Sequence, residues 1–289
     1  MKDYEKHLKT FDAFLVLKNY SIATRRSYGG LLKQFFEYRI DKGLVGSFTL
    51  DQARNYLLHR YSQGRKWQTI NGDYSALQHF YTKVLDVKWN ITHIPRPRAE
   101  RTLPVVLSKK SIQKIIEEGA DFKHQVFMTL LYCTGLRLNE AIHLRLADID
   151  GDRLQIHVVK GKGAKDRYVE MPVELLTLLR EYYLAYRPKV YLFNGKTDGS
   201  MWSSRTAQWS IKRAKKYAGV IKQVSAHVFR HCYATHHLEE GTNLVYLKDQ
   251  MGHTNIKTTA RYIRLCKSYP KRVHHPIADM KIEYKLEKR

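Results

Sequence analysis

Histidine, arginine and tyrosine gather in one short stretch of this 289-residue chain, from His227 to Tyr262. His227 and Arg230 are three residues apart, so on a helix their side chains share one face. His253 follows a glycine, Gly252, and Tyr262 comes nine residues after His253. Such groups suit a charged, oxygen-rich ligand. A phosphate is the obvious candidate, because the planar fork of arginine matches phosphate oxygens bidentately.

Other candidate residues lie earlier in the chain, and each has an ordinary explanation when taken alone. Arg137 and Glu140 have the spacing of a simple ion pair on a helix. Lys162 lies in a glycine-rich turn, GKGAKD, where a lysine is usually a solvated charge. This turn lacks the pattern of a nucleotide-binding loop, so no cofactor is predicted. His227 and His231 are spaced like a metal-binding pair, but no acidic third ligand is suitably placed, so no metal site is predicted.

The order of these motifs is far more specific than any one of them. TGLRLNE, a strand followed by GKG, then HVFRH, MGH and a tyrosine occur in turn. In this order the chain resembles the tyrosine recombinases of the phage-integrase family over nearly its whole length. Its size is close to that of the Xer recombinases and the integron integrases. An added N-terminal arm-binding domain is not expected. The helical insertion typical of integron integrases is not seen before His227, and this favours an Xer-like or mobile-element recombinase.

The resemblance implies roles for individual residues. Glu140 matches an acidic position that supports the first arginine, and His231 matches a second histidine with a more structural role. Met251 and Phe229 replace leucines that are usual in the family, and both keep an apolar side chain. The positions implied to be catalytic are Arg137, Lys162, His227, Arg230, His253 and Tyr262.

The chemistry implied by the resemblance is covalent. Tyr262 attacks phosphorus to give a 3′-phosphotyrosine and a free 5′-hydroxyl. The phosphotyrosine bond retains the energy of the broken phosphodiester bond, so the strands can be rejoined without ATP. The arginines neutralise the phosphate, and Lys162 protonates the departing oxygen. His227 either accepts the tyrosine proton or holds the phosphate, and the sequence leaves both open. A type IB topoisomerase shares this chemistry without strand exchange and is the alternative; a DNA-binding regulator with a decayed site is disfavoured because every matching position is intact.

The charge of the chain favours a nucleic acid as its partner. Lysine and arginine number 51 against 27 acidic residues, a net charge of +24 that is spread along the chain. So much self-repulsion is typical of proteins that bind a polyanion, and we expect double-stranded DNA. The sequence has no long apolar run, so no membrane segment is predicted. Cys133, Cys232 and Cys266 read as reduced thiols, so we expect a cytoplasmic protein. The resemblance implies a bacterial, phage or mobile-element origin.

The N-terminal part of the chain predicts a helical bundle. Apolar spacing indicates helices from Asp3 to Leu17 and from Trp67 to Val87, and between them Ser21 and Thr49 with Gln52 supply N-caps. The resemblance implies that residues 1–94 form a core-binding domain, and the Pro- and Arg-rich residues 95–106 predict a linker. Basic residues expected to contact the DNA backbone are Arg25, Arg26, Arg60, Arg65, Lys66, Arg96, Arg98 and Arg101.

Residues 107–289 are expected to form the catalytic domain and its C-terminal tail. Ser108 is a natural N-cap, and a helix that carries Arg137 and Glu140 is predicted over 136–146. Alternation from Leu154 to Val158 predicts a β-hairpin around GKG, and the remaining segments predict helices over 174–186, 203–218, 225–238 and 243–250. The fold class is mainly α with a small β-hairpin (α+β). The resemblance implies a C-shaped clamp on DNA and a homotetramer that exchanges strands through a Holliday junction.

Overall fold

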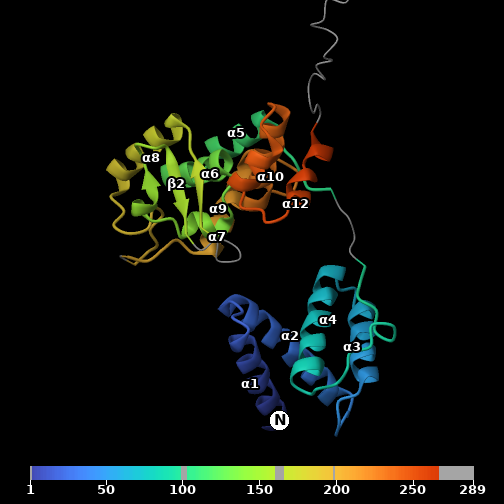
Figure 1. The fold of residues 1–289 in the computed structure, drawn as a ribbon. Helices are drawn as coiled ribbons and strands as arrows, with labels where there is room; N and C mark the ends of the chain where they lie inside the picture. The colour runs from blue at the N-terminus through green and yellow to red at the C-terminus, as the bar shows by residue number, and fades with distance from the viewer. Residues whose placement is uncertain (1, 99–102, 160–165, 198, 267–289) are drawn as a thin grey trace, which may run out of the picture. The chain divides into compact units, whose positions relative to one another are not determined.

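A computed structural model describes residues 2–98, 103–159, 166–197 and 199–266 of the chain (Figure 1). The chain divides into two compact units, Met1–Thr102 and Leu103–Arg289. Lys162, Arg101 and the predicted C-terminal tail lie outside the described residues. Among the helices that are described, none is long and apolar enough to cross a membrane.

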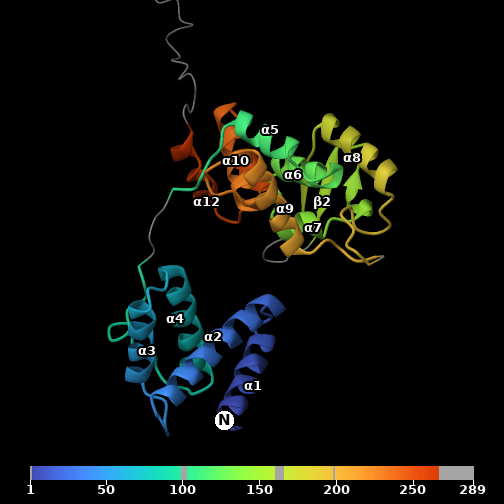
Figure 2. The same cartoon turned by 180° about the vertical axis from the view of Figure 1, so that it is seen from behind.

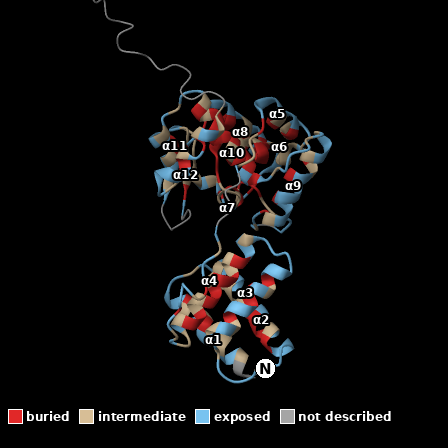
Figure 3. Ribbon diagram, turned by 90° about the vertical axis from the view of Figure 1, so that its right-hand side faces the viewer, coloured by how far each residue is buried: buried red, intermediate tan, exposed pale blue. Residues whose placement is uncertain are grey.

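The first unit is a bundle of helices around an aromatic core. Phe35, Phe36, Phe80 and Tyr81 are each at most 2% exposed and lie within this core. Figure 3 shows the buried segments along the inward faces of the helices. The helices are α1 (Lys2–Leu17), α2 (Ile22–Asp41), α3 (Leu50–Ser62) and α4 (Trp67–Lys83).

The predicted helix starts in this unit are confirmed. Ser21 accepts a hydrogen bond from the backbone N–H of Thr24 at 3.2 Å, so it caps α2. Thr49 and Gln52 form the reciprocal capping box at the start of α3, with both bonds at 3.3 Å. These side chains satisfy backbone donors that the first turn of a helix leaves free.

The prediction that Arg60 is exposed toward DNA was wrong. Its side chain is 8% exposed, and its Nε donates to Oδ2 of Asp73 at 3.0 Å. Arg60 lies one turn after the buried Tyr56 on α3, so it faces α4, where Asp73 is fully buried. A buried charge needs such a partner, and this arginine therefore holds two helices together instead of facing solvent.

The second unit is built around helix α10 (Ala226–Glu239), most of whose residues are buried (Figure 3). It packs against α6 (Phe122–Thr134), and α6 packs against α8 (Val173–Tyr186). In both views the sheet lies beside α8 (Figures 1 and 2). The other helices are α5 (Lys109–Glu117), α7 (Leu138–Ile142), α9 (Ser204–Tyr217), α11 (Leu244–Gln250) and α12 (Ile256–Ala260), with 3₁₀ turns at Leu146–Asp148 and Ile263–Leu265.

A small antiparallel sheet completes the second unit and confirms the predicted hairpin. Its strands are β1 (Ile149–Asp150), β2 (Gln155–Val158) and β3 (Arg167–Glu170), in the order β1-β2-β3. The buried Ile156 and Val169 are opposite one another in the β2–β3 register. The mainly helical fold class with a small sheet is therefore confirmed. Strand β1 was not predicted, because two residues are too short to show an alternating pattern.

The helix predicted over 136–146 is much shorter, and Arg137 precedes it. Gly135, with φ of +60°, ends α6 in the left-handed conformation, and Arg137 is extended at the N-cap of α7. The chain leaves the helix at His143 because the next residues pair with a distant segment: the carbonyl of Leu144 accepts from the N–H of Leu192 at 2.8 Å. The local sequence favours a helix, and this tertiary pairing ends it.

Candidate active site

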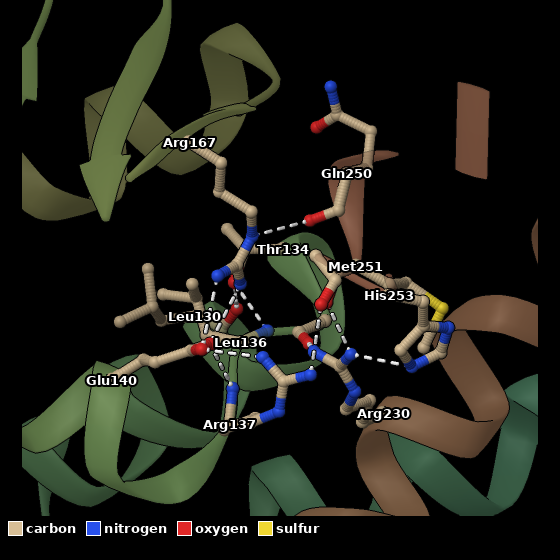
Figure 4. Close-up of polar contacts among 12 residues, drawn as sticks. Leu130, Thr134, Leu136, Arg137, Glu140, Arg167, Arg230, Gln250, Met251 and His253 are labelled. Carbon is tan, nitrogen blue, oxygen red and sulfur yellow. Dashed lines mark hydrogen bonds and ion pairs between the residues drawn. The ribbon is translucent and has the colours of Figure 1, made fainter. Parts of the chain in front are cut away.

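Arg230 lies at the centre of the candidate site and is almost completely buried. Helix α10 carries it on the same face as His227, as the spacing predicted. Its exposed fraction is 4%, and its Nη1 donates to the carbonyl of Gly135 at 2.6 Å. Its Nη2 donates to the carbonyl of Met251 at 2.5 Å and to Nε2 of His253 at 3.0 Å (Figure 4). These contacts fix the guanidinium plane.

Arg137 reaches the same loop from a different element. Its Nη2 donates to the carbonyl of Gly252 at 3.2 Å, next to the Met251 carbonyl that Arg230 uses. Its Nη1 donates to Oε1 of Glu140 at 2.7 Å, and Oε2 of the same carboxylate accepts from the Arg137 backbone N–H at 2.9 Å. Two consecutive carbonyls therefore bring the two guanidinium groups together. Gly252 has φ of +60°, a conformation that glycine adopts readily.

The site holds an excess of positive charge. Arg137, Arg167 and Arg230 carry three charges against the single carboxylate of Glu140, and 3 − 1 leaves an excess of two. Burial acts to raise the pKa of Glu140, but the hydrogen bonds and charges of the arginines outweigh it and lower that pKa to about 2. Burial, together with the charge of Arg137, lowers the pKa of Arg230 to about 10, so it stays protonated at pH 7. An anion such as phosphate would relieve this excess.

His253 is neutral in this structure and its tautomer follows from its partners. Burial and the charges of Arg230 and Arg137 lower its pKa to about 3. A guanidinium can only donate, so Nε2 of His253 accepts from Arg230. The proton therefore resides on Nδ1, which lies 2.8 Å from Oγ1 of Thr259 on α12 and donates to it.

Tyr262 is held by His231, not by His227. Its hydroxyl lies 3.0 Å from Nδ1 of His231, and Nη2 of Arg261 donates to the same oxygen at 3.4 Å. Burial, followed by the charge of Arg261 and smaller effects of His227 and Arg230, lowers the pKa of His231 to about 4. A neutral imidazole beside a phenol that already accepts from Arg261 is placed to accept the phenol proton. Tyr262 is only 1% exposed.

The remaining predicted residues make no described hydrogen bond to the arginine pair or to Tyr262. The ring of His227 lies 6.5 Å from that of His231, and burial lowers its pKa. Arg25 donates to Asp12 at 2.9 Å, and Arg96 donates to Asn71 at 2.9 Å, so both are engaged by their own unit. The other described basic residues predicted to contact DNA are exposed: Arg26, Arg65, Lys66 and Arg98.

Arg167 was not predicted to belong to the cluster. Arg167 on β3 makes a two-pronged contact with Glu140, with Nη1–Oε1 at 3.0 Å and Nη2–Oε2 at 2.7 Å (Figure 4). A signal was present, because Arg167 has the same parity along the strand as the buried Val169 and must face the core. A charged residue on that face requires a partner. No group of three or more His, Cys, Asp or Glu side chains suited to a metal occurs among the described residues.

Comparison with known proteins identifies the family of the chain. Residues 106–268 match the profile of the "Phage integrase family", and residues 8–91 match "Phage integrase, N-terminal SAM-like domain". A "Tyrosine recombinase" of Thermosipho africanus is 34% identical and covers 90% of this chain and 95% of its own. "Tyrosine recombinase XerC" of Staphylococcus haemolyticus is 27% identical over 91% of this chain and 94% of its own.

The fold is also shared with solved structures. A lambda integrase dimer bound to a COC′ core site aligns with a TM-score of 0.73 at 16% identity, covering 89% of this chain and 94% of that one. Because the catalytic-domain profile covers more than half of the chain and a relative above 30% identity covers nearly all of it, the family is established. The chain belongs to the phage integrase family and is a tyrosine recombinase.

Proposed function

We propose that this chain is a site-specific recombinase that cuts and rejoins double-stranded DNA through a bond between Tyr262 and a 3′ phosphate. The observation that carries the proposal is the convergence of Arg137 and Arg230 on two consecutive carbonyls beside His253. The buried guanidinium of Arg230 and the partly exposed one of Arg137, with the carboxylate of Glu140 as the acid beside them, suit a group that is anionic and becomes more so during reaction. A scissile phosphodiester is such a group.

The roles follow from the chemistry of each side chain. Arg137 and Arg230 stabilise the charge on the non-bridging oxygens, and each preorganised donor of this kind is worth roughly a hundred- to a thousandfold in rate. His253 donates a hydrogen bond to the phosphate once DNA displaces its contact with Arg230 and Nε2 takes up a proton, because that nitrogen accepts from Arg230 in the structure. Lys162 protonates the departing 5′-oxygen, a role that rests on the family resemblance alone.

Two histidines compete for the proton of Tyr262. The 3.0 Å contact between His231 and the Tyr262 hydroxyl supports His231 as the acceptor. Proton transfer by a positioned group contributes roughly a hundred- to ten-thousandfold. His227 then serves the phosphate, on the same helical face as Arg230. Because Tyr262 is 1% exposed, DNA binding must also uncover it before a phosphate can reach its hydroxyl.

The surrounding assembly is part of the proposal. Residues 1–94 act as a core-binding domain, residues 95–106 link it to the catalytic domain of residues 107–289, and the two domains clamp DNA. The lambda integrase neighbour, described as a dimer bound to a core site, supports DNA as the partner. We further propose a homotetramer during strand exchange and a bacterial cytoplasmic location. Relatives named as recombinases, not topoisomerases, disfavour simple relaxation as the function.

Trapping of the covalent intermediate tests the proposal. The protein is incubated with fragmented genomic DNA of its host, adducts are stopped with denaturant, and the linked 3′ ends are sequenced. The recovered site is then built into a nicked duplex from which the cut strand dissociates, so that adduct accumulates. Tyr262→Phe should form no adduct while it binds the same duplex with unchanged affinity. An undiminished adduct in that variant would show that Tyr262 is not the nucleophile.

Further experiments on the recovered site distinguish the two candidate proton acceptors, and recombination from topoisomerase activity. His231→Gln should slow adduct formation more than His227→Gln if His231 accepts the proton, and the reverse order would assign that role to His227. Two marked copies of the site should exchange partners in the presence of the wild-type protein. Relaxation of supercoiled DNA without any exchange would instead favour the topoisomerase alternative.

A further inference from the structure

Arg167 connects three parts of the candidate site that are distant in sequence. It lies on β3, and its Nη1 and Nη2 donate to the two carboxylate oxygens of Glu140 on α7 (Figure 4). Its Nε donates to the carbonyl of Gln250 at 3.0 Å, at the end of α11. The side chain is only 11% exposed. Each of its three nitrogen atoms is thus already directed at protein oxygen, so it is poorly placed to bind a substrate.

The packing around Arg167 is as specific as its hydrogen bonds. A Cβ atom added to Gly252 would lie 2.9 Å from Cδ and 3.0 Å from Nε of Arg167. The carbonyl of Gly252 in turn accepts from Arg137. Arg167 therefore contacts the Gly252 turn directly, and it acts on Arg137 a second time through Glu140, whose Oε1 accepts from both arginines.

We infer that Arg167 is a positioning residue that fixes the guanidinium of Arg137, through Glu140 and the Gly252 turn, in the orientation that the scissile phosphate requires. The inference rests on the proposed function. Glu140 is bound by Arg167 on one side and Arg137 on the other, so the first contact determines where the second can form. Only a planar fork can make both bonds to the carboxylate and a third to Gln250, which a lysine cannot reproduce.

The first test is a comparison of DNA binding with the cleavage rate. Arg167→Ala and Arg167→Lys should bind the nicked duplex with unchanged affinity, because the side chain is buried and engaged. Their single-turnover cleavage rates should fall by roughly ten- to a hundredfold, since a small misplacement of a positioning group can cost about a hundredfold. Arg153→Ala is the matched control: it removes an arginine of the same sheet region that is 79% exposed, and its rate should not change.

The second test asks whether Arg167 acts through Arg137. If it does, the double variant Arg137→Ala/Arg167→Ala should cleave no more slowly than Arg137→Ala alone, because the group being positioned is already missing. Deficits that multiply would overturn the inference. Arg167→Lys allows the same comparison with Arg137→Ala should the alanine variant not fold.

A modified substrate distinguishes positioning from a purely structural role. When one non-bridging oxygen of the scissile phosphate is replaced by methyl, the group loses its negative charge and depends less on the arginine pair. The deficits of Arg137→Ala and Arg167→Ala should then both shrink, measured as disappearance of the intact strand. An equal deficit on both substrates, with a lowered melting temperature, would make Arg167 a folding residue. Absence of any adduct with the wild-type protein would instead contradict the proposed function.

Discussion

Glu140 carries one negative charge that two guanidinium groups share. Its side chain is 8% exposed, and the arginines hold its pKa at about 2 against an ordinary value of 4.5, although burial acts in the opposite direction. A carboxyl whose pKa is lower in the folded chain than in the unfolded chain stabilises the fold at high pH. Its contribution is complete above pH 4.5 and is lost as the pH falls through 2. Acid should therefore weaken the fold progressively below pH 4.5, whereas the Arg137–Glu140–Arg167 contacts themselves should break only as the pH approaches 2.

Replacement of Glu140 by glutamine should destabilise the protein strongly. The change leaves Arg137 and Arg167 facing a neutral amide, and removal of one partner from a buried ion pair costs about 3 to 5 kcal/mol. The free energy of unfolding from urea titration measures the loss. Glu174→Gln removes an exposed carboxylate from α8 and should change the stability very little. Equal effects of the two changes would mean that the shared carboxylate does not stabilise the site.

The sequence indicates the side chains proposed to react more readily than it indicates their partners in the fold. The pairing of Arg137 with Glu140 follows from a spacing of three residues, and it is present in the structure. The contact between Glu140 and Arg167 joins residues 27 apart, and the contact between His231 and Tyr262 joins residues 31 apart. Such contacts depend on where β3 and α12 are packed. No local pattern encodes that packing, so a partner of Tyr262 could not be chosen from the sequence.

Helices that begin with a capping side chain were predicted well, and irregular turns were not. Ser21, Thr49 and Ser108 each mark a helix start by a local bond that their own sequence neighbourhood supplies. Helix α7 was overestimated because its end is determined by the pairing of Leu144 with Leu192, which lies far along the chain. Local chemistry is thus readable in the sequence, whereas competition from tertiary contacts is not.

The turn at Gly135 joins two elements of the site, and its substitution separates backbone strain from packing. Gly135→Ala would adopt φ of +60° and place Cβ 2.4 Å from the ring of Tyr233 on α10. The left-handed conformation costs about 1 to 2 kcal/mol, and the overlap adds about 1 to 3 kcal/mol. Cleavage should also slow, because the Gly135 carbonyl accepts from Arg230.

Gly241 provides the matched control for that prediction. It has φ of +90°, but nothing lies within 4 Å of an added Cβ. Gly241→Ala should therefore show only the conformational cost of about 1 to 2 kcal/mol in the free energy of unfolding, with cleavage unaffected. If both variants lost the same stability, the contact between the Gly135 turn and Tyr233 would have no energetic importance.

The net charge of +24 acts at the scale of the whole molecule. Basic residues that neutralise phosphates release counterions, so the logarithm of DNA affinity falls linearly with the logarithm of salt concentration. The slope reports how many phosphates are contacted. A protein with six to ten such contacts loses roughly a thousand- to a hundred-thousandfold in affinity between 50 and 200 mM salt. Filter binding or fluorescence anisotropy over this range gives the slope for the recombination site.

Arg65 and Lys66 allow that slope to be assigned to a surface. Both are exposed at the start of α4, and if each contacts a phosphate, their joint replacement by alanine should reduce the slope by about two. Lys33→Ala removes a charge that is also exposed but lies 3.9 Å from Glu37. This control should leave the slope unchanged. If the slope fell in proportion to net charge in every variant, DNA affinity would depend on the total charge of the protein and not on contacts with these two side chains.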